Sequence, residues 1–200
     1  SDVCSSDLRL RHSVESACQQ GFAAIPTRPH RKDLRNPICF MKLAKLLSAD
    51  QIILDMKAVE HWPAITELVD HLVETGLLPP TLREETLTAL KAREDQVSTG
   101  IGSGVAIPHA FSDQLENVVA VFGRSKEGID FEAIDNAPVH FIVLFIVPRK
   151  DYHMHLRTLA AIAKMFTNCE VRRQLGLAET RDEILAILDC KPSRVAAPGA

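Results

Sequence analysis

The apolar residues between positions 63 and 76 recur every three to four residues. They are Ile65, Leu68, Val69, Leu72 and Val73. This spacing places them along one face of a helix. Pro63 suits the first turn of such a helix, whose N–H groups need no partner within the helix, and Gly76 suits its end. The pattern therefore predicts an amphipathic helix over this segment.

Later segments of the chain also have helical patterns. Thr81–Lys91 follows a Pro-Pro break and is rich in helix formers. The segment that opens at His155 carries an apolar face made of Leu156, Leu159, Ile162, Ala163 and Phe166. Glu170–Leu177 predicts a short helix. Thr180 and Glu183 have the spacing of a capping box, which predicts a last helix that buries Ile184, Ile187 and Leu188.

Runs of β-branched and aromatic residues between the helical segments predict strands. The runs are Ile52–Leu54, Val105–Ile107, Val118–Phe122 and Val139–Val147. The last run is apolar on both faces except at His140, as expected of a central strand covered by helices on each side. This alternation predicts one α/β domain, with a β-sheet between helical layers, from residue 41 to about residue 190. The pattern leaves open whether the sheet is parallel or mixed.

The two ends of the chain differ from this pattern. Residues 1–40 mix serine, arginine, proline and cysteine without a helical or alternating period, so we expect a disordered or loosely attached extension. Ser1–Leu8, which reads SDVCSSDL, resembles translated sequencing-adapter DNA, and this suggests a non-native extension and a natural start at Met41. Residues 191–200 are rich in proline and alanine, and we expect a flexible tail.

The composition is that of a soluble globular protein, with 46% hydrophobic and 24% charged residues. A formal net charge of -3 argues against a nucleic-acid binder that acts through a basic surface. The longest apolar run, Phe141–Val147, is too short to span a bilayer, and no secretory signal is found near the start. The five cysteines form no CxxC pair, which disfavours a zinc ribbon or a disulfide framework. We therefore expect a reduced, cytoplasmic protein.

Candidate chemistry is concentrated in the stretch VSTGIGSGVAIPHA, residues 97–110. It contains the alternate glycines Gly100, Gly102 and Gly104, whose flexible backbone lets N–H groups approach an anion closely. Pro108 follows the short strand and lacks an amide donor, so we expect strand pairing to stop there. His109 is then presented at the end of a strand, beside a glycine-rich loop.

These features are compatible with a phosphohistidine site. Neutral imidazole is a nucleophile near neutral pH, and it can accept a phosphoryl group and pass it on. Such transfer needs in-line positioning and donors around the phosphoryl oxygens, which the glycine loop and the guanidinium of Arg93 could supply. The alternative is a glycine-rich turn with a surface histidine, and the spacing by itself slightly favours it. ATP binding is disfavoured because no GK[ST] follows the glycines.

A second group of histidines lies at His153 and His155. His155 is a candidate for stabilising a phosphoryl group on His109, and the alternative is a polar residue at the start of a helix. A hydrolase or zinc protein that uses all three histidines is a further alternative. It is disfavoured because no HxxxH, HExxH or clustered Cys/His spacing is present.

Several motifs occur together in an order that resembles the IIA proteins of the bacterial phosphoenolpyruvate-dependent phosphotransferase system (PTS). The resemblance is to the fructose/mannitol type, which includes the nitrogen-regulatory IIA proteins. It runs from Met41 to about Leu188 and opens with MKLAKLLSADQIILDM. The other motifs are Arg93-Glu94, Ser98–Gly102, Val105–His109, Ile129–Phe131, Ala133–Asp135, Pro138-Val139, Val147-Pro148 and His155-Leu156.

The resemblance implies a cytoplasmic α/β domain with a mixed sheet flanked by helices on both faces. It implies that His109 is phosphorylated by the histidine-containing phosphocarrier protein, with His155 and Arg93 in supporting roles. The phosphoryl group would then pass to a IIB partner that serves a sugar permease. In the nitrogen-type alternative, the phosphorylation state is read by regulatory partner proteins. No metal, organic cofactor, nucleic acid or membrane insertion is implied.

Overall fold

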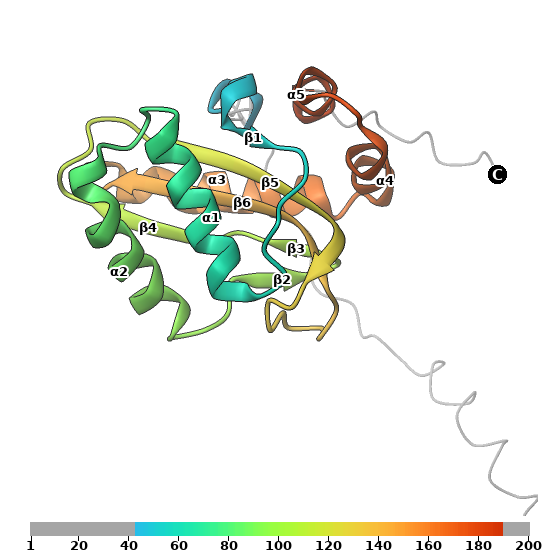
Figure 1. Cartoon of the computed structure of the whole chain (residues 1–200), viewed down its shortest axis with the longest axis horizontal. Coiled ribbons are helices and arrows are strands. Elements are labelled where there is room, and N and C mark those ends of the chain that lie inside the picture. The colour runs from blue at the N-terminus through green and yellow to red at the C-terminus, as the bar shows by residue number, and fades with distance from the viewer. Residues whose placement is uncertain (1–42, 190–200) are drawn as a thin grey trace, which may run out of the picture. The chain divides into compact units, whose positions relative to one another are not determined.

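The computed structural model describes residues 43–189, and the expectations about residues 1–40 and 191–200 lie outside this range. The alternation of helices and strands expected from the sequence is wrong: along the described chain two helices follow the first short strand, five strands then follow one another, and three helices come last (Figure 1). The strands are β1 (Ile52–Ile53), β2 (Gly100–Gly102), β3 (Val105–Ala106), β4 (His109–Ser112), β5 (Val119–Ile129) and β6 (Val139–Pro148). The α-helices are α1 (His61–Glu74), α2 (Arg83–Glu94), α3 (Tyr152–Phe166), α4 (Cys169–Leu177) and α5 (Arg181–Asp189). Short 3-10 turns lie at Leu43–Lys45, Ala49–Gln51, Pro80–Leu82 and Arg149–Asp151.

The six strands of the described chain form one mixed sheet in the order β1-β5-β6-β3-β2, and β4 also pairs with β6. β6 is antiparallel to β5 along one side. Along its other side it pairs in parallel with β3 and then with β4. The mixed α/β fold expected from the resemblance is therefore confirmed.

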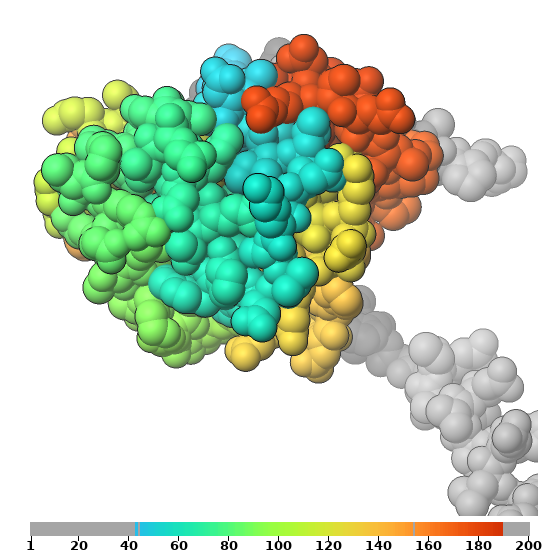
Figure 2. Space-filling model, viewed as in Figure 1, coloured from blue at the N-terminus to red at the C-terminus, as the bar shows by residue number. Residues whose placement is uncertain are grey.

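Helices cover both faces of the sheet, as predicted. α1 and α2 pack on one face, and their side chains form the left and centre of the surface seen in Figure 2. α3, α4 and α5 lie on the opposite face (Figure 1). β6 contributes to both layers, because alternate side chains of a strand point to opposite faces. Its residues towards α1 and α2 are Ile142, Leu144 and Ile146, and those towards α3 are Phe141, Val143 and Phe145.

The predicted apolar face of α1 is confirmed, with Ile65, Leu68, Val69 and Leu72 buried. The helix begins at His61, two residues before the expected start, and Pro63 lies in its first turn. Gly76 follows the end of the helix with a φ of +73°, a conformation that glycine adopts without steric strain.

The predicted apolar face of α3 is wrong at one position. Leu156 is 59% exposed, whereas His155, Thr158, Ile162 and Phe166 are buried. The helix begins at Tyr152, and the stripe that packs on the sheet passes through His155. Adjacent residues of a helix are separated by about 100°, which turns Leu156 away from the sheet.

β5 is longer than expected and continues through a polar segment to Ile129. The polar residues concealed the strand because one of them, Arg124, is buried in the core. Its guanidinium donates hydrogen bonds to the carbonyl oxygens of Leu54 and Leu175, each at 2.9 Å, and to that of Ala178. Arg124 therefore joins the sheet to the C-terminal end of α4.

None of the helices between residues 43 and 189 is both long enough and apolar enough to cross a membrane.

Candidate functional site

His109 is the first residue of β4, in register with Phe145 of β6. The expectation that strand pairing stops at Pro108 is wrong. Proline lacks only the amide donor, and the Pro108 carbonyl still accepts a hydrogen bond from the Phe145 N–H at 3.0 Å. The chain therefore continues along β6 after the proline, and the backbone of His109 is held within the sheet.

The three glycines lie in and after β2, where the chain turns into β3. Gly102 and Gly104 have φ values of +86° and +76°. A Cβ atom on Gly100 would lie 2.8 Å from the Cα of Ala133, so glycine allows residues 133–140 to pack closely on this hairpin. Gly100 pairs with Ala106, three residues before His109 and therefore about 10 Å away along the strand. The structure thus places the glycines beside residues 133–140 and does not gather them around His109.

The hydrogen bonds of His109 define its tautomer. Nδ1 lies 3.0 Å from the carbonyl oxygen of Ile107. A carbonyl only accepts hydrogen bonds, so Nδ1 carries the proton and Nε2 keeps its lone pair. Burial lowers the pKa of the half-buried His109 below its usual 6.5, and the charges of Arg93 and His155 act in the same direction. The Ile107 carbonyl and Glu94 oppose this shift. His109 is therefore neutral at pH 7, with a nucleophilic Nε2.

Arg93 lies in the last turn of α2 and points at this nitrogen. Its Nε donates to His109 Nε2 at 3.4 Å, a long and therefore weak hydrogen bond, and its Nη1 donates to the carbonyl of Val97 at 2.9 Å. The structure thus brings together Arg93 and His109, two residues singled out in the sequence.

Glu94, the next residue, anchors the end of α2. Its carboxylate accepts hydrogen bonds from the N–H of Thr99 at 2.6 Å and from the hydroxyl of Thr99 at 2.8 Å. His61 Nε2 lies 3.1 Å from the same carboxylate. Burial opposes ionisation of Glu94, but the nearby His61 and the hydrogen bonds from Thr99 outweigh it and lower the pKa. Thr99 also accepts a hydrogen bond from Ile107, so Glu94 links Arg93 to the strand that leads to His109.

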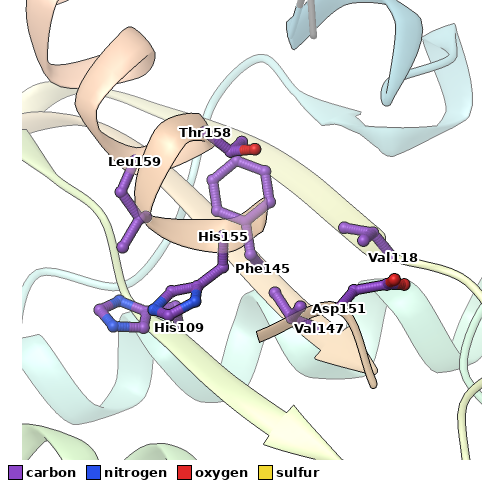
Figure 3. A pocket seen from close by; sticks show the side chains of 8 residues that line it. All are labelled: His109, Val118, Phe145, Val147, Asp151, His155, Thr158 and Leu159. Atoms are coloured by element: carbon purple, nitrogen blue, oxygen red, sulfur yellow. The ribbon is translucent and has the colours of Figure 1, made fainter. Parts of the chain in front are cut away.

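His155 reaches the site from the first turns of α3. Its ring centroid lies 6.1 Å from that of His109. Its Nδ1 faces the carbonyl oxygen of Tyr152 in the same helix. Figure 3 shows the two imidazoles close together at one end of the pocket that they line. The other residues that line it are Val118, Phe145, Val147, Asp151, Thr158 and Leu159.

The remaining sequence candidates contribute less. His153 is exposed on α3, two residues before His155. Within residues 43–189, no three His, Cys, Asp or Glu side chains are grouped so that they could hold a metal ion. His140 is half-buried, and its Nδ1 contacts the carbonyl of Ser125 at 3.0 Å.

Sequence reasoning missed the residues that support the candidate site from other segments. These are His61 and Thr99, which contact Glu94, and the aromatic residues Phe111 and Tyr152, which contact His155. Thr99 and Glu94 lie within motifs that carry the family resemblance, which was an available signal. Phe111 offered a weaker one, because it lies two residues after His109 and the alternation of a strand places both on one face.

Comparisons with known proteins agree with this architecture. Residues 45–191 match the family described as phosphoenolpyruvate-dependent sugar phosphotransferase system, EIIA 2. The chain is 36% identical over 149 residues to the PTS system fructose-specific EIIABC component of Bacillus subtilis. This alignment covers 74% of this chain and 23% of that protein. It is 34% identical over 140 residues to the PTS system fructose-specific EIIA component of Haloferax volcanii, in an alignment that covers 68% of this chain and 90% of that protein.

A solved structure extends the comparison. The nitrogen regulatory protein IIA-Ntr from Neisseria meningitidis superposes with a TM-score of 0.67 at 30% identity, over 73% of this chain and 98% of that chain. The family match covers most of the chain and includes every helix and strand from β1 to α5. The chain therefore belongs to the EIIA 2 family of the phosphoenolpyruvate-dependent sugar phosphotransferase system.

Proposed function

We propose that this protein carries a phosphoryl group on His109, which it accepts from the histidine-containing phosphocarrier protein and passes to a IIB partner. The observation that carries the proposal is the neutral imidazole of His109, whose Nδ1 is engaged by Ile107 and whose Nε2 faces the guanidinium of Arg93. This arrangement offers a nucleophile and a cation on the same side of the ring.

The transfer follows from these positions. The Nε2 lone pair of His109 attacks the phosphorus of the donor phosphohistidine, and a new N–P bond forms as the donor N–P bond breaks. The electron pair of the broken bond returns to the donor imidazole. Arg93 then exchanges its weak hydrogen bond with Nε2 for charge-assisted hydrogen bonds to phosphoryl oxygens. His155, whose Nδ1 faces the Tyr152 carbonyl, lies 6.1 Å from His109 between ring centroids, close enough to contact a phosphoryl group on His109.

The second transfer reverses the first. A thiolate on the IIB partner attacks the phosphorus, the S–P bond forms, and Nε2 of His109 recovers its lone pair. Catalysis in both directions depends mainly on in-line positioning and on charge stabilisation, which Arg93 and His155 supply.

The surface near the site supports a protein partner over a small-molecule substrate. Val97 and Leu156 are exposed apolar side chains on the segments that carry Arg93 and His155. Apolar side chains around a polar centre are typical of a surface that docks another protein. A transfer partner in the cytoplasm would cover this rim and exclude water from the phosphoryl group.

A regulatory function is the second candidate, and the similarity to a nitrogen regulatory protein IIA-Ntr favours it. Phosphorylation would add about −1.5 to −2 charges beside Arg93 and change which partners this surface accepts. The two functions share the phosphohistidine and differ in whether the phosphoryl group moves on to a IIB thiol.

The test is incubation of the protein with phosphoenolpyruvate, enzyme I and the phosphocarrier protein, using labelled phosphate. We expect acid-labile label on the wild type and on the His153→Ala variant, whose exposed histidine serves as the matched control. The His109→Ala variant should take up no label, and label that persists in it would overturn the assignment. Addition of a IIB protein then separates the two functions, because loss of label to IIB indicates transport and its retention indicates regulation.

A further inference from the structure

Three aromatic rings meet beside the candidate phosphohistidine. The ring of His155 contacts Phe111 in a T-shaped arrangement, with centroids 4.8 Å apart and an interplanar angle of 89°. It contacts Tyr152 at 4.8 Å with an interplanar angle of 51°. The rings of Phe111 and Tyr152 are themselves 5.2 Å apart. His155 itself belongs to α3, is 7% exposed, and packs its ring against Phe111 of β4.

The two aromatic residues come from the segments that carry the two histidines. Phe111 follows His109 by two residues in β4, and Tyr152 precedes His155 by three residues in α3. Tyr152 acts on His155 twice, because its carbonyl oxygen faces Nδ1 while its ring packs on the imidazole. Its own side chain is 49% exposed, so burial of the tyrosine alone does not account for its position.

The imidazole of His155 must keep one orientation if it is to support a phosphoryl group on His109. The terminal torsion of histidine is broad and roughly two-fold, so a ring flip exchanges nitrogen and carbon positions. A flip of His155 would break the contact between Nδ1 and the Tyr152 carbonyl and turn Nε2 away from its present direction. Packing by Phe111 and Tyr152 on the ring opposes that flip.

We propose that Phe111 and Tyr152 are positioning residues that form an aromatic clamp, which holds the His155 imidazole beside the phosphoryl group on His109. The clamp acts on the phosphotransfer rate through His155 and does not itself touch the phosphoryl group. This inference rests on the proposed function, since it assigns the clamp to the same transfer step.

The test measures kcat and KM for phosphotransfer from the phosphorylated carrier protein. We expect Phe111→Leu and Tyr152→Leu each to lower kcat by about tenfold, the upper range for loss of one aromatic pair, with KM for the carrier unchanged. Tyr152→Phe keeps the ring and the backbone carbonyl and should restore the wild-type rate to within about twofold. Leu177→Ala, at an exposed apolar residue of α4, is the matched control and should leave kcat unchanged.

A double-mutant cycle shows whether the clamp acts through His155. In a His155→Ala background, Phe111→Leu and Tyr152→Leu should lower kcat no further, because the ring that they position is absent. An undiminished tenfold effect in that background would overturn the proposal. A raised KM with unchanged kcat would also overturn it, since it would place Tyr152 in partner docking. The half-exposed Tyr152 tolerates leucine, so the cycle remains interpretable even if Phe111→Leu fails to fold.

The labelling of His109 in the wild type is measured first, because it distinguishes failure of the proposed function from failure of the aromatic clamp. If the wild type takes no label on His109, the proposed function fails, and the clamp fails with it. If the wild type is labelled and both leucine variants transfer at the wild-type rate, only the clamp is refuted.

Discussion

Replacing Arg124 by methionine should lower the free energy of unfolding by about 3 kcal/mol. The side chain is 2% exposed, and its guanidinium donates to three backbone carbonyls, those of Leu54, Leu175 and Ala178. Methionine fills a similar volume but donates no hydrogen bond. The change therefore leaves the three carbonyl oxygens without this partner while keeping the core packed.

The magnitude follows from two opposing effects. An unsatisfied buried acceptor destabilises by about 1–3 kcal/mol, so three of them could destabilise by several kcal/mol. Removal of the buried charge recovers part of this, because a buried ion carries a desolvation penalty of several kcal/mol. Asp55 offsets little of that penalty, since it is half-exposed and lies 3.7 Å from the guanidinium. The balance gives about 3 kcal/mol, or a fall in Tm of about 6–12 °C for a domain of this size.

Urea unfolding followed by circular dichroism measures this change, and Arg149→Met is the matched control. Arg149 makes an ion pair with Asp113 at 2.8 Å but is 63% exposed. An exposed pair contributes about 0–1 kcal/mol, so the control should unfold close to the wild type. Equal stability of Arg124→Met and the wild type would refute the reasoning, because it would show that the three carbonyls need no buried donor.

Four further outcomes test the candidate site and its scaffold. Arg93→Ala should lower phosphotransfer strongly and leave Tm nearly unchanged, and a large fall in Tm would instead make Arg93 a structural residue. Burial and Arg93 lower the pKa of His109, so the phosphotransfer rate should stay constant to below pH 6.5 and fall only when Nε2 is protonated at lower pH. A pH–rate profile whose acid midpoint lies at or above 6.5 would contradict this. Arg93→Ala should move that midpoint upwards. The lowered pKa of Glu94 contributes stability that is present above its usual 4.5 and is lost as the pH falls through the lowered value. Glu94→Gln should therefore lower the free energy of unfolding at pH 7, and the stabilities of the variant and the wild type should become equal in acid. A difference in urea midpoints that stays constant across this pH range would count against the hydrogen-bonded carboxylate. Gly100→Ala should destabilise the protein by about 1–3 kcal/mol through overpacking. Gly176→Ala is the control and should not destabilise it, because nothing lies within 4 Å of the added Cβ. Equal Tm values for the two variants would exclude a close-packed hairpin.

The differences between the predicted and the observed elements have a common origin. The polar run in β5 concealed a strand because Arg124 is buried against carbonyls from distant segments. The spacing of Leu156 fits the buried face of α3, but packing on the sheet buries His155 and leaves Leu156 exposed. Pro108 was expected to end a strand, and its carbonyl still pairs with β6. In each case a contact with another element overrides the local preference.

The sequence by itself determined the apolar face of α1, the two-sided central strand β6, the α/β fold class and the motifs that mark the family. These features are local, because the period of a helix or a strand is written in neighbouring residues. Only the tertiary structure decided which residues meet at His109. The register of β4 on β6 and the position of α3 place Phe111, Tyr152 and His155 together, and Glu94 joins α2 to β2 and α1. Such contacts between distant segments depend on how the strands pair and how the helices pack. The spacing of residues within one segment does not encode them.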